Sequence, residues 1–533
     1  MSFDPTNRAL KLAPREWIFL GLTILFWAGF VILLGKDTSW DFRNYHWYNP
    51  YQLLNGRLAI DVAVAHAGSY YNPYIDVPFY LLATHTTSWF ALGVLGAVQG
   101  ANIVPLYVIA RQSLRIPEFE LGAGALALLG QTGAQSVSLF GTTYYDNVVS
   151  LFILSALAMI VVYRETLTRG KFSHIAIICG VTGFITGSAM GLKLPSAPFT
   201  MGFAAALLAL GGSWKHQLTR LVAGGIGGVA GAILFAAPWM LRMDELTGNP
   251  LFPYFNQYFK SDLVLNATYR DLRFVPTTFW HALLFPFLFA IDWHVAGDLG
   301  FQDIRVALAY TACFVLAAAW LLRRTSKDPL IDARAALPIL AFSAATYLVW
   351  LRTFAIYRYI VGLEMLSPVV LTAAVGSLPV TRRTQLIALG ILFGAALVVS
   401  RSDFIEHAPL GDPYVQAAIP PIPHPDKTMV LMTGDAPLGF IATTLPPQIP
   451  VLRIDGWMLQ PQDGTKMTAQ MRARVAGHLR NGGELYLIAE AFDMGRARNA
   501  LAEYNLAILW TGCQLFDTNL VGTYQWCPVT PRQ

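Results

Sequence analysis

The stretch WDFRNYHWYNPYQLLNGRLAIDV, residues 40–62, groups an acid, a base and an imidazole among aromatic side chains. Asp41 and His46 lie directly beyond an uncharged apolar run, and a second acid, Asp146, lies in FGTTYYDNVVSLF between two further runs. A carboxylate in an enclosed site can accept the proton of an attacking hydroxyl group. The ordinary alternative for both acids is N-capping of the helix that follows, because Asp is a favoured N-cap.

Three basic residues also lie near the ends of apolar runs. Lys193 occurs in GLKLPSAP, and Arg352 and Arg358 occur in RTFAIYRYIVGLEMLSP. A lone cation at such a place usually extends to the lipid headgroups. Several cations together can instead bind a phosphate or pyrophosphate, for which arginine supplies a fork and lysine a point charge. With two acids nearby, this pattern indicates an anionic, lipid-linked substrate.

Two further groups of ionisable residues have weaker signals. Glu364 follows Arg358 by six residues, roughly 9 Å along a helix, so it should face a partner or a cavity. Four residues of the first long loop could bind a divalent cation through oxygen or imidazole: His46, Asp61, His66 and Asp76. Their spacing matches no metal motif, and solvated loop residues are the preferred interpretation.

The elements that position these residues are membrane helices. The chain has 533 residues, of which 55% are hydrophobic and 13% charged, with a mean hydropathy of +0.47. Residues 17–34 carry no charge and would form about 27 Å of helix, close to a hydrocarbon core of about 30 Å. We expect an uncleaved anchor there, and about eleven membrane-spanning helices in all: 17–34, 88–110, 121–139, 147–162, 174–191, 197–210, 221–241, 305–322, 336–351, 359–377 and 385–400.

Lysine and arginine indicate the orientation of these helices. Each short segment on the N-terminal side of the bundle carries at least two of them, which predicts a cytoplasmic N-terminus. An odd number of spans then places loops 35–87 and 242–304, and the tail from residue 401, outside. The net charge of +5 follows from this topology, and no basic tract indicates a nucleic acid. The glycine-rich residues 224–231 predict helix packing rather than a dinucleotide site.

The outer segments should be folded. The aromatic residues 41–56 predict a helix in the headgroup layer. The apolar residues 279–291 are too few to span a bilayer, which indicates an interfacial or re-entrant helix. From residue 403 the runs TMVLMT, PVLRI, LYLIA and LAILW alternate with turn signals and with a predicted helix at 466–480, after the linker PIPHPDK. We therefore expect an external α/β domain over 403–533, in which Cys513 and Cys527 could form a disulfide.

This layout resembles the GT-C superfamily of membrane glycosyltransferases, which move a sugar from a polyprenyl-phosphate carrier to an acceptor on the non-cytoplasmic side. The motifs that carry the resemblance are WDFRNYH, NPYIDVPFYLL before the second span, TTYYDNVVSLF, GLKLPSAP and RYIVGLEML, which is similar to the late arginine-tyrosine motif of the family. The resemblance covers residues 17–400. It implies a GT-C-like module over 1–402, a bacterial cytoplasmic (inner) membrane and a periplasmic or extracellular C-terminal domain.

The resemblance also implies roles for single residues. Asp41 would be the base for the acceptor hydroxyl, Asp146 would support the acceptor or a metal, and Lys193 and Arg358 would hold the carrier phosphate. The resemblance leaves open whether a divalent cation, Mg²⁺ or Mn²⁺, takes part, because DFRN lacks the second acid that many relatives have there.

Further substrate contacts and partners follow from the same resemblance. Substrate contacts are expected from Arg352, His46, Tyr45 and Glu364. The expected partners are the polyprenyl-phosphate-linked sugar donor, an acceptor that is a glycan, a lipid or a protein, and membrane lipids.

Two other functions stay open. A lipid-linked oligosaccharide flippase or another transporter would place ionisable groups near mid-span and show internal symmetry. A scaffold protein would present the external domain to partners. The charges lie at the outer ends of the spans and no internal repeat is evident, which favours an enzyme.

Overall fold

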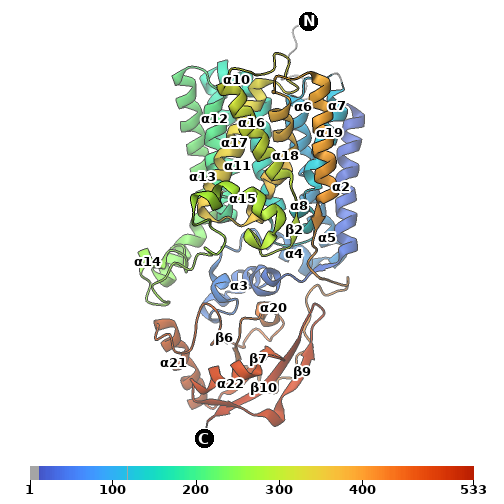
Figure 1. The fold of residues 1–533 in the computed structure, drawn as a ribbon. Helices are drawn as coiled ribbons and strands as arrows, with labels where there is room; N and C mark the ends of the chain where they lie inside the picture. The colour runs from blue at the N-terminus through green and yellow to red at the C-terminus, as the bar shows by residue number, and fades with distance from the viewer. Residues whose placement is uncertain (1–10, 117, 533) are drawn as a thin grey trace.

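Long helices form a bundle from the N-terminal three quarters of the chain, and a mixed sheet forms the C-terminal quarter (Figure 1). The computed structural model describes residues 11–116 and 118–532. The bundle helices are α2 (Pro14–Leu34), α5 (Ser88–Gly100), α6 (Ile103–Ser113), α7 (Phe119–Gln131), α9 (Asp146–Val162), α11 (Phe172–Leu192), α12 (Pro198–Ala209), α13 (Trp214–Thr247), α16 (Arg305–Leu321), α17 (Ala333–Thr353), α18 (Val361–Val375) and α19 (Arg382–Val399).

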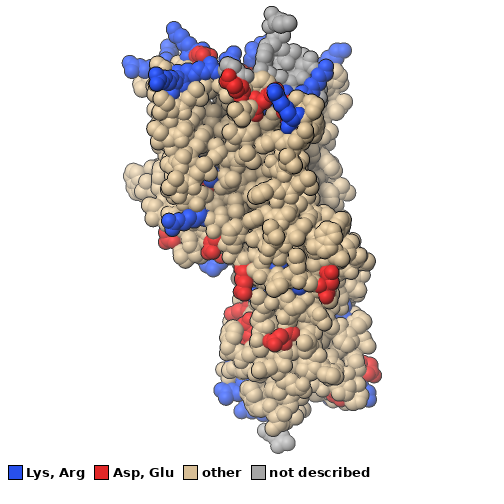
Figure 2. All heavy atoms as spheres, turned by 90° about the vertical axis from the view of Figure 1, so that its right-hand side faces the viewer, with Lys and Arg blue, Asp and Glu red and all other residues tan. Residues whose placement is uncertain are grey.

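The bundle has the composition of a membrane-embedded structure. Within the described residues, seven helical segments are long and apolar enough to cross a membrane: Pro14–Leu34, Ser88–Ser113, Phe172–Leu192, Trp214–Thr247, Ala333–Thr353, Tyr357–Val375 and Arg382–Val399. All eleven ranges predicted as spans overlap helices. Figure 2 shows Lys and Arg gathered at the end of the bundle remote from the sheet, with a wide band almost free of charge beneath them.

Glycine contacts join α11 and α13. A Cβ atom on Gly183 would overlap the carbonyl oxygen of Gly224, and one on Gly187 would overlap that of Gly228. The two helices therefore approach as closely as backbones allow, which is the role of small residues in membrane helix packing. The helix-packing interpretation of residues 224–231 is confirmed.

The first long loop lies between the bundle and the C-terminal domain (Figure 1). It contains a π-helical turn η1 (Phe42–His46), α3 (Tyr48–Leu54) and α4 (Val77–His85), and Figure 1 shows α3 between the bundle and the sheet. Trp47, Tyr48 and Tyr51 are buried. The aromatic residues expected in the headgroup layer are therefore covered by protein. An aromatic pattern does not reveal whether lipid or protein covers it.

The second outer loop carries α14 (Asn256–Phe259) and the predicted short helix α15 (Phe279–Ile291). Phe285 and Phe289 of α15 pack against the bundle, while Phe279 and Ile291 are exposed. After α15, strand β2 (Phe301–Gln302) pairs with β3 (Arg401–Ser402), and the first loop's β1 (Lys36–Asp37) pairs with β4 (His407–Ala408). Both outer loops are thus tied to the segment that leads into the sheet.

The C-terminal domain is a six-stranded sheet with order β6-β5-β7-β10-β8, and β9 pairs with β10. β5 (Thr428–Met432) runs parallel to β6 (Val451–Arg453) and β7 (Glu484–Glu490), and β10 (Thr523–Pro531) runs antiparallel to β7. Helix α21 (Lys466–Arg480) has the predicted bounds. Cys513 and Cys527 form a disulfide. The domain also contains α20 (Gly439–Ala442), α22 (Met494–Ala502), β8 (Leu506–Ile508) and β9 (Gln514–Asp517).

Candidate active site

Arg358 brings three carboxylates together at the end of the bundle that faces the C-terminal domain. It belongs to the 3₁₀ turn η6 (Tyr357–Ile360) that precedes α18. Its Nη2 lies 3.4 Å from Oδ2 of Asp41 and 3.4 Å from Oδ2 of Asp298, and its Nη1 lies 3.6 Å from Oδ2 of Asp146. The three acids come from the first outer loop, the start of α9 and the second outer loop. Segments more than 300 positions apart therefore meet at one guanidinium group.

Lys193 completes the cluster from a fifth segment. It directly follows α11, and its Nζ donates to Oδ1 of Asp146 at 2.5 Å and to the carbonyl oxygen of Tyr144. Asp146 thus touches both cations. Neither Asp146 nor Asp41 uses its side chain to cap the following helix, so the N-capping alternative does not describe these carboxylates.

Tyrosine rings surround the cations. The Arg358 guanidinium lies 4.3 Å from the ring centre of Tyr144 and 5.0 Å from that of Tyr359, and Lys193 Nζ lies 5.6 Å from that of Tyr359. The Tyr45 hydroxyl hydrogen-bonds Asp41. Ring faces stabilise the cations where water is scarce, and rings of this kind can also pack against the apolar face of a sugar.

The cluster is largely buried but open at one edge. The side-chain exposure is 13% for Asp41 and 8% for Arg358, against 38% for Asp298. Burial raises the pKa of Asp41, Arg358 opposes this shift, and the carboxylate of Asp298 adds to it. A carboxylate with a raised pKa is a stronger proton acceptor, as a general base requires.

His46 lies beside the cluster and is held by a buried carboxylate. Its Nδ1 is 2.6 Å from Oδ1 of Asp76. Burial lowers the pKa of His46 well below its ordinary value, and the charges of Lys193 and Arg358 act in the same direction. Burial raises the pKa of Asp76 well above its ordinary value. Burial and the two nearby cations thus favour the neutral imidazole, which can exchange hydrogen bonds with a substrate hydroxyl.

The four loop residues considered as metal ligands are not solvated, so that preferred interpretation was wrong. His46, Asp61, His66 and Asp76 are all buried. His46 contacts Asp76, Asp61 pairs with Arg57 at 2.6 Å, and the ring of His66 packs against Trp40. The C-terminal domain and other residues of the same loop cover these four side chains. The sequence around each residue does not reveal such distant contacts.

The donor groups present do not fit a divalent cation. Over residues 11–116 and 118–532 no three His, Cys, Asp or Glu side chains are placed to hold a metal ion. The position between Asp41, Asp146 and Asp298 is taken by Arg358.

Two expected substrate contacts lie apart from the cluster. Arg352 is exposed near the end of α17. Glu364 is fully buried in α18, where it accepts the backbone N–H groups of Gln135 and Ser136 at 3.1 and 2.9 Å. It thereby holds α8 (Ala134–Ser138) against α18. The structure thus brings together Asp41, Asp146, Lys193, Arg358 and Tyr45, with His46 adjacent.

Sequence reasoning missed three residues of the cluster: Asp298, Tyr144 and Tyr359. Asp298 belongs to DWHVAGDLGF, where its only signal is that it lies in the second long outer loop. Tyr144 lies two residues before Asp146, and Tyr359 directly follows Arg358. Aromatic residues are frequent in this chain, so these positions alone do not indicate a role. Their role follows only from their distances to the cations.

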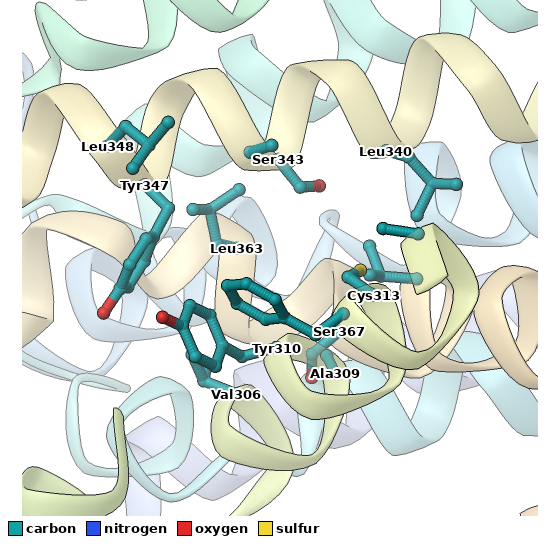
Figure 3. Close-up of a pocket in the computed structure, with 14 residues that line it drawn as sticks. Val306, Ala309, Tyr310, Cys313, Leu340, Ser343, Tyr347, Leu348, Leu363 and Ser367 are labelled. Carbon is teal, nitrogen blue, oxygen red and sulfur yellow. The ribbon is translucent and has the colours of Figure 1, made fainter. Parts of the chain in front are cut away.

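An apolar cleft of about 300 Å³ lies between α16, α17 and α18. In Figure 3 the hydroxyl groups of Tyr310 and Tyr347 lie at one end of it, and Leu340 and Cys313 lie at the other. Leu363, which lines the cleft, follows Arg358 by five residues, about 8 Å along a helix. The cleft is apolar and large enough to hold part of a hydrocarbon chain.

Comparisons with known proteins add no assignment to this geometry. The chain matches no protein-family model, no curated protein and no solved structure. The functional argument therefore depends on the arrangement of the residues themselves.

Proposed function

We propose that this protein is a GT-C-type membrane glycosyltransferase that moves a sugar from a polyprenyl-phosphate carrier to an acceptor hydroxyl at the outer face of the bacterial cytoplasmic membrane. One observation carries the proposal: Asp41, Asp146, Lys193 and Arg358, from four separate segments, meet in one cluster at the end of the bundle. A proton acceptor and two phosphate-binding cations are the groups that such a transfer needs.

The reaction is a single displacement with inversion. Asp41 accepts the acceptor proton while the acceptor oxygen forms a bond to the anomeric carbon. The bond from that carbon to the phosphate oxygen breaks, and its electron pair leaves with the phosphate. Lys193 and Arg358 stabilise the developing charge. Asp146 keeps both cations in place, and Asp298 lies at the exposed edge, where the lipid phosphate can take its position beside Arg358.

Two further features support a lipid-linked donor. The apolar cleft beside α18 can hold part of an isoprenoid chain while the phosphate lies at Arg358. The Lys and Arg rim at the opposite end of the bundle (Figure 2) fits a cytoplasmic N-terminus under the positive-inside rule. With eleven spans, the cluster and the C-terminal domain would both lie outside. A polyprenyl donor would then enter sideways from the outer leaflet.

The test is a transfer assay on purified protein in detergent, with polyprenyl-phosphate sugars as donors. The wild-type protein should release sugar, and Asp41→Asn should lower the rate about 10²- to 10⁴-fold. Arg352→Gln is the matched control, because this exposed cation lies outside the cluster. A folded Asp41→Asn variant with the wild-type rate would remove the catalytic assignment. A wild-type protein that releases sugar from none of these donors would refute the proposed function.

A further inference from the structure

Helix α20 (Gly439–Ala442) of the C-terminal domain packs directly on the turn that follows Asp41. A Cβ atom on Gly439 would overlap the carbonyl oxygen of Asn44 and would lie 3.2 Å from Cβ of Tyr48. Gly439 has no positive φ, so alanine could adopt its backbone conformation. What requires glycine at this position is the close approach to the turn.

Neighbouring contacts hold the same turn. Trp47 Nε1 donates to Oγ1 of Thr443 at 3.1 Å. The Trp47 ring stacks on Tyr414 with 5.5 Å between the ring centres, and Phe42 packs against both rings, 5.5 Å from Trp47 and 5.7 Å from Tyr414. Both Phe42 and Tyr414 are buried. The turn is therefore enclosed by residues that follow the membrane bundle in the chain.

The end of the first outer loop is also joined to the C-terminal domain. The backbone of Val62 continues the sheet beyond β6, accepting from the N–H of Arg453 and donating to the carbonyl oxygen of Val451, both at 3.0 Å. Arg57 donates to the carbonyl oxygen of Ile449 at 2.6 Å. This segment thus binds the sheet edge by strand addition, so the loop is anchored at two places.

The turn itself sets the direction of Asp41. It is π-helical, with the N–H of Trp47 bonded to the carbonyl oxygen of Phe42 at 3.2 Å. A π turn holds one residue more than an α turn and is costly unless its surroundings support it. Relaxation to an α-helical register would rotate the residues before the turn by roughly 100° relative to those after it. Asp41 would then no longer point at Arg358.

We propose that α20 is the positioning element of the active site and that Gly439, through its backbone contact with Asn44, holds Asp41 in line with Arg358. This inference rests on the proposed function for its catalytic consequence. The C-terminal domain then has a role in the chemistry. It orients the Asp41 carboxylate, although none of its described side chains belongs to the charged cluster.

The experiment compares Gly439→Ala with Gly495→Ala in the full-length protein. Gly495 lies in α22 of the same domain and has nothing within 4 Å of an added Cβ. Hydrogen exchange of a peptide covering Phe42–His46 measures the stability of the turn. Sugar transfer from a polyprenyl-phosphate donor measures whether Asp41 is placed to act as the base. Gly439→Ala should speed exchange in this peptide about tenfold and lower kcat at least tenfold. The KM for the donor should change little, because Lys193 and Arg358 lie on other elements.

Each combination of results decides the inference. Faster exchange with a lower kcat supports it, provided that Gly495→Ala matches the wild type. Unchanged exchange, or faster exchange with an unchanged kcat, overturns it. If Gly439→Ala does not fold, Thr443→Val replaces it. This variant removes the bond from Trp47 and the bond that Thr443 donates to the carbonyl oxygen of Phe440, and it should give the same changes at a smaller size. A wild-type protein without transferase activity refutes the proposed function, whereas unchanged exchange in Gly439→Ala refutes the positioning role.

Discussion

Two clusters of buried charge in this protein are built differently. In the inner cluster, Glu364 accepts two backbone N–H groups at 2.9 and 3.1 Å, and Arg305 donates to two backbone carbonyl oxygens at 2.7 and 2.9 Å. In the outer cluster, Arg358 lies 3.4 to 3.6 Å from its three carboxylates, and Oδ2 of Asp146 has no hydrogen-bond partner. Glu364 and Arg305 are bound mainly by backbone groups at normal bond lengths. Arg358 is held by side chains at longer distances, whereas Lys193 keeps short contacts with Asp146 and with the carbonyl oxygen of Tyr144.

This difference distinguishes buried charged residues that stabilise the fold from those that can bind a ligand. A buried ion must have partners, since an exposed charge in hydrocarbon costs several kcal/mol. Backbone partners of fixed geometry leave no capacity for a ligand. Loosely placed side-chain partners can be replaced by a phosphate. A transporter would need mobile ionisable groups within the bundle, and Glu364 is fixed there instead.

The largest effect that separates the two clusters is expected from Arg358→Gln. Loss of the guanidinium group should lower transfer from a polyprenyl-phosphate donor about 10²- to 10³-fold, because one charge that stabilises the departing phosphate is removed. Steady-state kinetics over a range of donor concentrations measures the change. Arg352→Gln should retain the wild-type rate. Equal losses in the two variants would show that the cluster has no special role.

A smaller effect of a different kind is expected from Glu364→Gln. The amide oxygen of glutamine can still accept from one backbone N–H, but its NH₂ group faces the other N–H and cannot accept from it. This lost hydrogen bond should lower the free energy of unfolding by about 1 to 3 kcal/mol. Thermal unfolding in detergent measures this loss. Transfer per folded molecule should stay near the wild-type value. A folded Glu364→Gln variant without activity would show that the inner cluster takes part in the reaction. The inner and outer clusters would then no longer differ in role.

The smallest effect concerns pH. The carboxylate of Asp298 raises the pKa of Asp41, so Asp298→Asn should lower that pKa. Because the base acts only when deprotonated, kcat/KM falls as pH drops through the pKa of Asp41. In wild type this acid limb should lie above the ordinary aspartate value of about 3.9, and in Asp298→Asn it should move to lower pH. A profile that moves to higher pH, or not at all, would contradict the electrostatic role of Asp298.

Much of the fold could be predicted because apolar length is a local signal. The helix at 466–480 has the predicted bounds, and each predicted span overlaps a helix. The run 121–139 was not one continuous helix, since α7 ends at Gln131 and α8 begins at Ala134. Its amides at the break are satisfied by Glu364 and Asp303. Such partners lie far along the chain, so the break has no local signature.

The candidate site was only partly visible in the sequence for the same reason. Asp41, Asp146, Lys193 and Arg358 stood out because charge beside an apolar run is unusual. Asp298 lies in a polar loop where an acid is ordinary. The burial of the first loop was missed because its cover, including α20, comes from almost 400 residues further along the chain.

Binding of undecaprenyl phosphate is the most direct test of the claim that the outer cluster, and not the inner one, receives the lipid phosphate. The measurement is the shift in Tm when this lipid is added to purified wild-type, Arg358→Gln and Glu364→Gln proteins, with undecaprenol as the uncharged control. At 100 times Kd a ligand stabilises its site by about 2.7 kcal/mol. We predict that only the phosphate raises Tm, in wild type and Glu364→Gln but not in Arg358→Gln. An equal shift in Arg358→Gln would contradict the account.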